Sequence, residues 1–298
     1  MTQQNTVRLA APAKINALLR VTERRDDGYH AIDTVFVALA LADEITLTKE
    51  PSGIRGATRM LDPRLPSHDL RGMDPDNLAY RAAQLWLEAA GVDAGVRIEV
   101  GKRIPIAGGL GGGSSDAAAV LQGMNRLYGA LDEGVMGRIA LALGSDVPFF
   151  LSGWPAARGR GRGERLETVS LPRRSMVLAN PGVAVSAGFA YRQLEGFGQP
   201  LGAALAGLWA GESQQTAPRN DLERGVRRHV SEVATALGTL EDVGLGEVTL
   251  SGSGATVFGL APGRVKAERA AEAIVNRPPN WWVAVTEGPA IPDAEASS

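Results

Sequence analysis

Hydrophobic and polar positions change their period several times along the chain, and each change indicates a different element. Residues 95–100 alternate between apolar and polar side chains, as a half-buried strand does. From 117 to 128, apolar residues recur at the spacing of one helix face, and Gly129 is well placed to end that helix. Five glycines lie between the two elements, within residues 104–116. The pattern therefore predicts a glycine-rich loop that leads from a strand into the N-terminus of a helix.

Similar patterns predict elements on both sides of this unit. Further strands are expected at residues 6–22, in two segments around Pro12, at 31–41, at 176–180 and, as a pair joined by a turn, at 247–260. Further helices are expected at residues 78–90, about 132–143 and 220 to about 240. Pro148 disfavours a helical Val147, so residues 144–150 are expected to form a loop that leads into an apolar strand. Residues 51–75 predict an irregular connection.

Composition narrows the class of protein. The 298 residues, 44% hydrophobic and 21% charged, are typical of a globular protein with one large or two ordinary domains. A net charge of −2 gives no reason to expect a nucleic-acid or membrane partner. The chain has no cysteine, which excludes disulfides and thiolate catalysis, and His30, His68 and His229 are too scattered for a zinc site. No apolar run reaches the ~18 residues of a membrane span, so a cytoplasmic location is expected.

The glycine-rich loop has the features of a phosphate site. Free backbone N–H groups and the positive end of the dipole favour an anion at a helix N-terminus, and a loop without side chains lets several amides approach one phosphate. No lysine follows the glycines, so this is not a Walker A loop, and the dinucleotide pattern fails at Ser114 or Asp116. A flexible linker is the alternative, but linkers seldom join a strand to an amphipathic helix. We interpret the loop as a nucleoside triphosphate site.

Four polar or charged residues outside the loop are candidates for chemistry. Only four of the 31 basic residues are lysine, so the chain uses arginine wherever a general surface cation is enough. Lys14 and Lys102 are therefore candidates for a specific use of the compact ammonium group, with chance as the alternative. Lys14 and Asn16 point to the same face of a predicted strand, which suggests a shared role; a solvated strand face is the alternative. Asp146 is the one carboxylate in an apolar neighbourhood, which fits a helix cap, an Asx-turn or a general base. With the phosphate loop, a lysine and an aspartate predict phosphoryl transfer.

Two further segments suggest binding rather than chemistry. Tyr29 and His30 follow an Asp-Gly hairpin turn, where an aromatic ring and an imidazole grip a planar ligand or simply cover the edge of a core. The run Arg158-Gly-Arg-Gly-Arg-Gly-Glu164 resembles an RNA-binding tract, but it is single, short and without interleaved aromatic residues. We expect it to form a hairpin loop. No nucleic-acid or membrane partner is predicted, only small molecules.

Five segments together resemble the GHMP kinase superfamily, and the similarity extends from about residue 7 to 285. They are Pro12-Ala-Lys-Ile-Asn16, Asp27-Gly-Tyr-His30, Pro105-Ile-Ala-Gly-Gly-Leu-Gly-Gly-Gly-Ser-Ser115, Leu143-Gly-Ser-Asp-Val-Pro148 and Gly252-Ser-Gly-Ala-Thr-Val-Phe258. The first two, with the fourth, are similar to the members that act on a cytidyl diphosphate ester of methylerythritol. Two residues depart from the family pattern: Ala107 replaces a glycine and Ser145 an alanine.

The resemblance implies an α+β fold of two domains with the active site in the cleft between them. Residues 1–155 would form an ATP-binding domain like the second domain of ribosomal protein S5, and residues 156–298 a C-terminal GHMP kinase domain. The activity implied is ATP-dependent phosphorylation of the 2-hydroxyl of the cytidyl substrate, by a monomer or homodimer. Another GHMP kinase, acting on mevalonate, homoserine or a sugar, is the alternative.

The resemblance also implies roles for individual residues. Lys14 and Asp146 would be the catalytic pair. ATP, with Mg²⁺ as its expected partner and with metal ligands unknown, would be bound by Asn77, Lys102, Pro105, Ile106, Ala107, Gly108, Gly109, Leu110, Gly111, Gly112, Gly113, Ser114 and Ser115. The cytidyl substrate would be bound by Asn16, Tyr29, His30 and Tyr191. Either tyrosine would stack on the cytosine, and His30 would hydrogen-bond to it.

Overall fold

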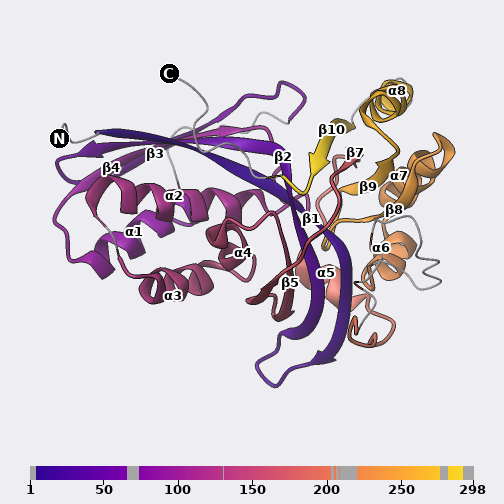
Figure 1. The fold of residues 1–298 in the computed structure, drawn as a ribbon, viewed down its shortest axis with the longest axis horizontal. Coiled ribbons are helices and arrows are strands. Elements are labelled where there is room, and N and C mark those ends of the chain that lie inside the picture. The colour runs from indigo at the N-terminus through magenta and orange to yellow at the C-terminus, as the bar shows by residue number, and fades with distance from the viewer. Residues whose placement is uncertain are drawn as a thin grey trace.

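The computed structural model describes residues 5–65, 74–129, 131–202, 205, 208, 220–275 and 281–290. Within these ranges the chain forms two β-sheets, each with its own helices (Figure 1). The predicted α+β class is therefore borne out. His68 and the rest of residues 66–73, part of the 51–75 connection, lie outside the described residues. No helix in the described part of the chain is long and apolar enough to cross a membrane.

The first sheet has the order β3-β4-β2-β5-β6, with β1 paired to β2, among the described residues. Its strands are β1 (Thr6–Arg24), β2 (His30–Glu50), β3 (Gly53–Met60), β4 (Gly95–Lys102), β5 (Ala156–Gly161) and β6 (Arg165–Thr168). Its helices lie together on one side of the sheet (Figure 1), and they are α1 (Leu78–Ala90), α2 (Gly112–Tyr128), α3 (Glu133–Leu143) and α4 (Val147–Ser152). A core that includes Trp86, Ile98 and Met124 fills the space between the helices and the sheet.

The second sheet has the order β10-β7-β9-β8, again within the described ranges. Its strands are β7 (Arg174–Asn180), β8 (Gly246–Leu250), β9 (Val257–Ala261) and β10 (Trp282–Gly288). The helices of this half are α5 (Ala187–Arg192), α6 (Glu223–His229), α7 (Ser231–Asp242) and α8 (Arg264–Val275). The chain passes from one sheet to the other between Thr168 and Arg174, so we propose the domain boundary there rather than at residue 155.

The hairpin of β1 and β2 connects the two halves. Its strands have 19 and 21 residues and bend past the edge of the second sheet (Figure 1). Ile15 and Leu39 of the hairpin share a core with Phe258 of the second sheet, while Leu19 and Ile32 pack into the core of the second half. Lys14 and His30 therefore lie on an element that is buried against both halves of the molecule.

Several sequence-based element predictions hold and others are wrong. The helix at 78–90 is confirmed, with Asn77 accepting a hydrogen bond from the Ala79 N–H. Residues 6–22 form one strand with irregular register rather than two segments. Residues 53–60 form an edge strand and not an irregular connection. The prediction was wrong because the side chains of this strand are exposed or only partly buried and show no hydrophobic pattern. The helix expected over 220–240 is divided into α6 and α7.

The prediction for residues 144–150 is the most informative error, because residues from Val147 onward form helix α4 instead of a loop that leads into a strand. Pro148 stands in the first turn of that helix, where its missing N–H would have no intrahelical partner. The prediction that Pro148 keeps Val147 out of a helix was therefore wrong. As a result Asp146 occupies the N-cap position of a helix and not the middle of a loop.

Candidate active site

The glycine-rich loop ends at Gly112, where α2 begins. The helix therefore starts five residues before the predicted start at residue 117. Gly111 occupies the N-cap position with a φ of 71°, in the left-handed region that favours glycine. It has no side chain to satisfy the first N–H groups of the helix. Ala107, which replaces a glycine of the family pattern, also has a left-handed φ of 55°. The first N–H groups of the helix therefore have no side-chain cap, which is the arrangement that the predicted anion site requires.

A cavity of about 370 Å³ lies against this loop. Of the residues predicted to bind ATP, its lining includes Asn77, Lys102, Pro105, Ile106, Ala107, Gly108, Gly109, Gly111, Gly112, Gly113 and Ser114. The other two, Leu110 and Ser115, are buried and do not line it. The exposed side chain of Ile106 and the partly buried side chain of Leu78 provide apolar surface beside the glycines.

The second half of the molecule holds the glycine-rich loop in place. The Thr256 N–H donates to the Gly108 carbonyl at 3.1 Å, and the Ser251 hydroxyl donates to the Gly109 carbonyl at 3.1 Å. From the first half, the Lys14 N–H donates to the Leu110 carbonyl at 2.9 Å. The loop is therefore clamped between β1 and the turn from β8 to β9.

A larger cavity of about 810 Å³ lies on the other side of the loop. Its lining includes all the residues predicted for catalysis and for the acceptor: Lys14, Asn16, Tyr29, His30, Asp146 and Tyr191. Gly252 and Ser253 from the second half complete the wall. Gly109 and Gly111 line both cavities. A phosphate held by these glycines would therefore face a second ligand in the larger cavity.

Lys14 and Asp146 lie next to each other beside the shared glycines. The Lys14 Nζ is 3.3 Å from Asp146 Oδ2, and it donates to Asn16 Oδ1 at 2.7 Å. Asn16 in turn donates from Nδ2 to the Thr34 hydroxyl at 2.8 Å. The Lys14 side chain is 5% exposed while that of Asp146 is 29% exposed, so the carboxylate is the member of the pair that a ligand reaches more easily.

Asp146 stands at the N-cap of α4 but makes no capping hydrogen bond from its side chain. Of the three roles that the sequence left open, the cap is therefore not used. Ser145, which replaces an alanine of the family pattern, also lines the larger cavity. The Asp146 carboxylate is left with Lys14 as its ion-pair partner.

Aromatic side chains form another wall of the larger cavity. The rings of His30 and Tyr191 are stacked with centroids 4.7 Å apart and planes 13° from parallel. Burial, and secondarily the charge of Arg24, lowers the pKa of His30 and favours the neutral imidazole. Burial, with the Asp146 charge, raises the pKa of Tyr191 to about 12, so its hydroxyl keeps its proton. Tyr29 lies further out and is 54% exposed.

Lys102 lines the smaller cavity, but its ammonium is engaged by buried carboxylates. It donates to Asp43 and, at 2.8 Å, to Asp116. Burial opposes its charge, but Asp116 and Asp43 outweigh this and raise the pKa of Lys102. Asp43 also accepts the N–H groups of Arg103 and Ile104, at the entrance to the loop. Sequence reasoning missed both carboxylates, because nothing local marks an aspartate as buried.

The buried network makes stability depend on pH through Asp116. Burial raises its pKa to about 7 from an ordinary value of 3.8, although Lys102 lowers it. Because the native state keeps a proton that the unfolded state releases, the stability present below pH ~4 is lost as the pH rises through ~7. Asp116→Asn removes this term. Urea unfolding measures the free energy of unfolding of both proteins. The value for wild type minus the value for the variant should fall by at most about 4 kcal/mol between pH 4 and pH 8. A constant difference would contradict the assignment.

Comparison with known proteins places this geometry in a family. Residues 77–153 match the model of the GHMP kinases N terminal domain, and residues 198–280 match that of the GHMP kinases C terminal. A relative from Deinococcus radiodurans, named 4-diphosphocytidyl-2-C-methyl-D-erythritol kinase, is 43% identical over 283 residues, which cover 93% of this chain and 91% of the relative. The chain belongs to the GHMP kinase family. The resemblance found in the sequence is thereby confirmed.

Solved structures agree with the fold of this GHMP kinase. A crystal structure of 4-(cytidine 5'-diphospho)-2C-methyl-D-erythritol kinase is 40% identical, with a TM-score of 0.78 over 95% of this chain and 99% of that one. Homoserine kinase from Cytophaga hutchinsonii has a TM-score of 0.65 over 97% and 96% of the two chains, but only 18% identity, which shows the fold alone. The predicted two-domain GHMP kinase fold is confirmed.

Proposed function

We propose that this GHMP kinase transfers the γ-phosphoryl group of ATP to the 2-hydroxyl of 4-diphosphocytidyl-2-C-methyl-D-erythritol, with release of ADP. The observation that carries the proposal is the pair of cavities that share Gly109 and Gly111, with Lys14 and Asp146 beside them. Relatives that carry the name of this activity span almost the whole chain and provide further support.

The smaller cavity would hold ATP. The unsatisfied N–H groups at the start of α2 and the positive end of its dipole suit the phosphates, and the glycines allow the backbone to approach them closely. Lys102 would act mainly by positioning the glycine-rich loop, since its ammonium is bound by Asp43 and Asp116.

In the larger cavity, Asp146 would accept the proton of the attacking hydroxyl. Phosphoryl transfer has a loose transition state, so the proton leaves late and the base needs no strongly raised pKa. Lys14 would orient Asp146 and offset the developing negative charge. The Asn16 amide fixes the ammonium from the other side and is itself fixed by Thr34.

Mg²⁺ is expected with the nucleotide, and the residues at the start of α2 fit it. Asp116 lines the smaller cavity, and its Oδ1 is a buried oxygen without a hydrogen-bond partner, the type of ligand that this cation prefers. Ser115 Oγ is a second such oxygen, although Ser115 does not line the cavity. No group of three His, Cys, Asp or Glu side chains in the described part of the chain forms a metal site. When bound, the ion would neutralise phosphate charge while phosphates and waters fill most of its coordination sphere.

The aromatic wall would bind the cytosine. A flat base stacks well on the Tyr191 or Tyr29 ring, and a neutral imidazole at His30 both donates and accepts a hydrogen bond. Mevalonate, homoserine and a sugar contain no ring of this kind to stack. The aromatic wall therefore favours the cytidyl substrate over those of other GHMP kinases.

Acceptor specificity tests the proposal. ADP release should be measured with the cytidyl substrate, mevalonate, homoserine and galactose at equal concentrations. We expect the cytidyl substrate to have a kcat/KM at least about 10³-fold above the others, because only it uses the aromatic wall. Faster turnover of another acceptor would assign the chain to a different GHMP kinase. The cytoplasmic location and the oligomeric state remain predictions.

A further inference from the structure

Three arginines line the larger cavity and have no role in the chemistry described above. Arg24 is the last residue of β1, Arg162 lies in the turn between β5 and β6, and Arg192 is the last residue of α5. They come from separate parts of the sequence and are brought together by the fold. The sequence alone shows 27 arginines and no sign that these three converge.

These guanidinium groups are not paired with acids in the described part of the structure. Neighbouring arginines do form ion pairs. Arg25 pairs with Asp27 at 2.9 Å, Arg158 with Asp33 at 2.6 Å, and Arg160 with Glu167 at 2.7 Å. The guanidinium of Arg162 lies over the Tyr29 ring, 4.6 Å from its centroid, and its charge also acts on Asp27, which is itself paired with Arg25. Three cations are thus left available to a ligand.

The cavity is consequently positive in a chain whose net charge is −2. Lys14 and the three arginines contribute positive charge, whereas Asp146 is the one carboxylate among the described residues of its lining. Lys14 is already matched by Asp146. The remaining charge of the lining, from the arginines, favours an anionic ligand with more than one negative charge.

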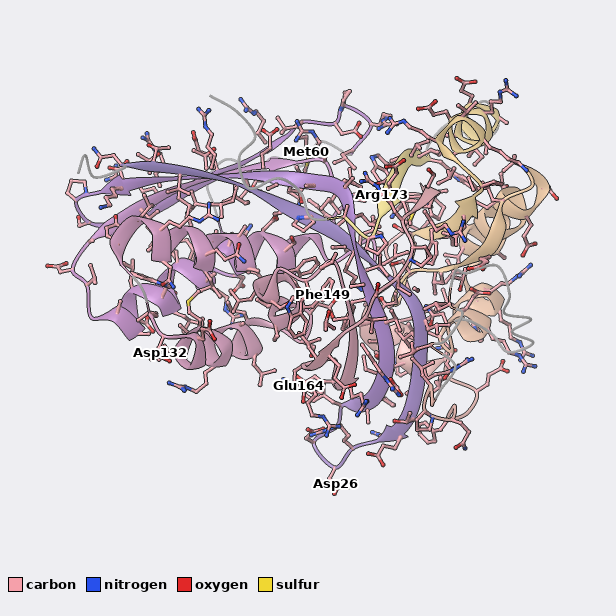
Figure 2. The ribbon with its side chains drawn as sticks, in the orientation of Figure 1. Asp26, Met60, Asp132, Phe149, Glu164 and Arg173 are labelled. Atoms are coloured by element: carbon pink, nitrogen blue, oxygen red, sulfur yellow. The ribbon has the colours of Figure 1, made fainter. Side chains whose placement is uncertain are left out.

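The positive charge is concentrated near the aromatic wall. Arg162 contacts Tyr29, and Arg24 lowers the pKa of His30 by its charge. A guanidinium nitrogen of Arg192 lies beside Gly188, which also lines the cavity. The hairpin tip is near the turn that carries Arg162, since Glu164 acts electrostatically on Arg25; Figure 2 shows Asp26 and Glu164 at the same end of the molecule. A nucleotide whose base stacks here would carry its phosphates past these cations.

We propose that Arg24, Arg162 and Arg192 form a diphosphate-binding subsite of the acceptor cavity. The guanidinium fork binds phosphate oxygens in pairs, and its charge is undiminished at neutral pH. The subsite selects acceptors that are linked to a nucleoside through a diphosphate and rejects neutral or monocarboxylate alcohols. The inference rests on the proposed function, because it assumes that the base of the acceptor stacks at the aromatic wall.

Calorimetric titration without ATP tests the subsite separately from turnover, with CDP, CMP and cytidine as ligands. Wild type should bind CDP more tightly than CMP, and CMP more tightly than cytidine. Arg162→Ala should weaken CDP binding about tenfold or more and leave cytidine binding nearly unchanged. Arg160→Ala is the matched control, because Arg160 belongs to the same run but pairs with Glu167 and does not line the cavity. Equal CDP affinity in both variants would overturn the proposal.

Additional variants keep the test decisive. Arg162→Lys retains the charge without the fork and should bind CDP with intermediate affinity, and it replaces Arg162→Ala if that variant does not fold. Arg24→Ala and Arg192→Ala should also raise KM for the cytidyl substrate, while kcat changes little. If wild type binds CDP in this manner but phosphorylates no cytidyl substrate, the proposed function fails and the subsite stands. If turnover occurs and the arginine variants do not alter KM, the subsite fails alone.

Discussion

Asp146→Asn is expected to lower kcat about 10²- to 10⁴-fold, the usual contribution of a positioned general base. Asparagine keeps the shape of the side chain but cannot take the proton of the acceptor hydroxyl. Because Asp146 lines only the larger cavity, KM for ATP should stay within about twofold of wild type. Initial rates of ADP release at saturating acceptor and varied ATP measure both quantities.

Asp132→Asn is the control for this substitution. Asp132 also stands at a helix N-cap, but it accepts a hydrogen bond from the Val135 N–H and lies on the helical side of the first half, away from the cavities (Figure 2). Asparagine caps as well as aspartate, so kcat and stability should both stay close to wild type. An unchanged kcat in Asp146→Asn would remove Asp146 from the mechanism.

Gly109→Ala is expected to impair both folding and catalysis. A Cβ at this position would lie 2.3 Å from the Ser251 carbonyl oxygen and 2.8 Å from that of Gly254, and the φ of 78° disfavours any side chain. Strain and the clash together should reduce the free energy of unfolding by about 2–5 kcal/mol. Any displacement of the loop would also lower kcat/KM for ATP, about 100-fold for a shift of ~1 Å.

Gly137→Ala provides the matched comparison in urea unfolding and in the kinetic assay. Gly137 lies within α3, and an added Cβ there meets no atom within 4 Å. Alanine should stabilise the protein by up to about 1 kcal/mol and leave kcat/KM unchanged. If Gly109→Ala were as stable and as active as Gly137→Ala, the phosphate loop would not be packed against the turn that contains Ser251.

Much of the fold was predictable because its signals are local. The apolar spacing from 117 to 128 and the cap at Asn77 marked α2 and α1 without knowledge of the tertiary structure. The edge strand 53–60 was missed because it buries little and so carries no hydrophobic pattern. Proline disfavours a helical conformation in the residue before it, but it is tolerated in the first turn of a helix. At Pro148 the second effect prevailed, and a helix formed.

The candidate site was predictable only in part, and for a different reason. The glycine-rich loop indicated a phosphate, but the roles of Lys14 and Asp146 came from the family resemblance, since the two residues are far apart in the chain. They lie 3.3 Å apart in the structure. The unpaired state of Arg24, Arg162 and Arg192 depends on which acids the fold places near them, which no sequence pattern reveals. Their roles, like those of the predicted site residues, remain predictions to be tested.

Phosphorus NMR of the reaction tests the central claim most directly. The enzyme should be incubated with ATP, Mg²⁺ and 4-diphosphocytidyl-2-C-methyl-D-erythritol until ADP accumulates. The account predicts one new phosphomonoester signal on the methylerythritol 2-oxygen, equal in amount to ADP, with the cytidyl diphosphate intact. Formation of ADP with only inorganic phosphate, or a phosphomonoester at another oxygen, would contradict it.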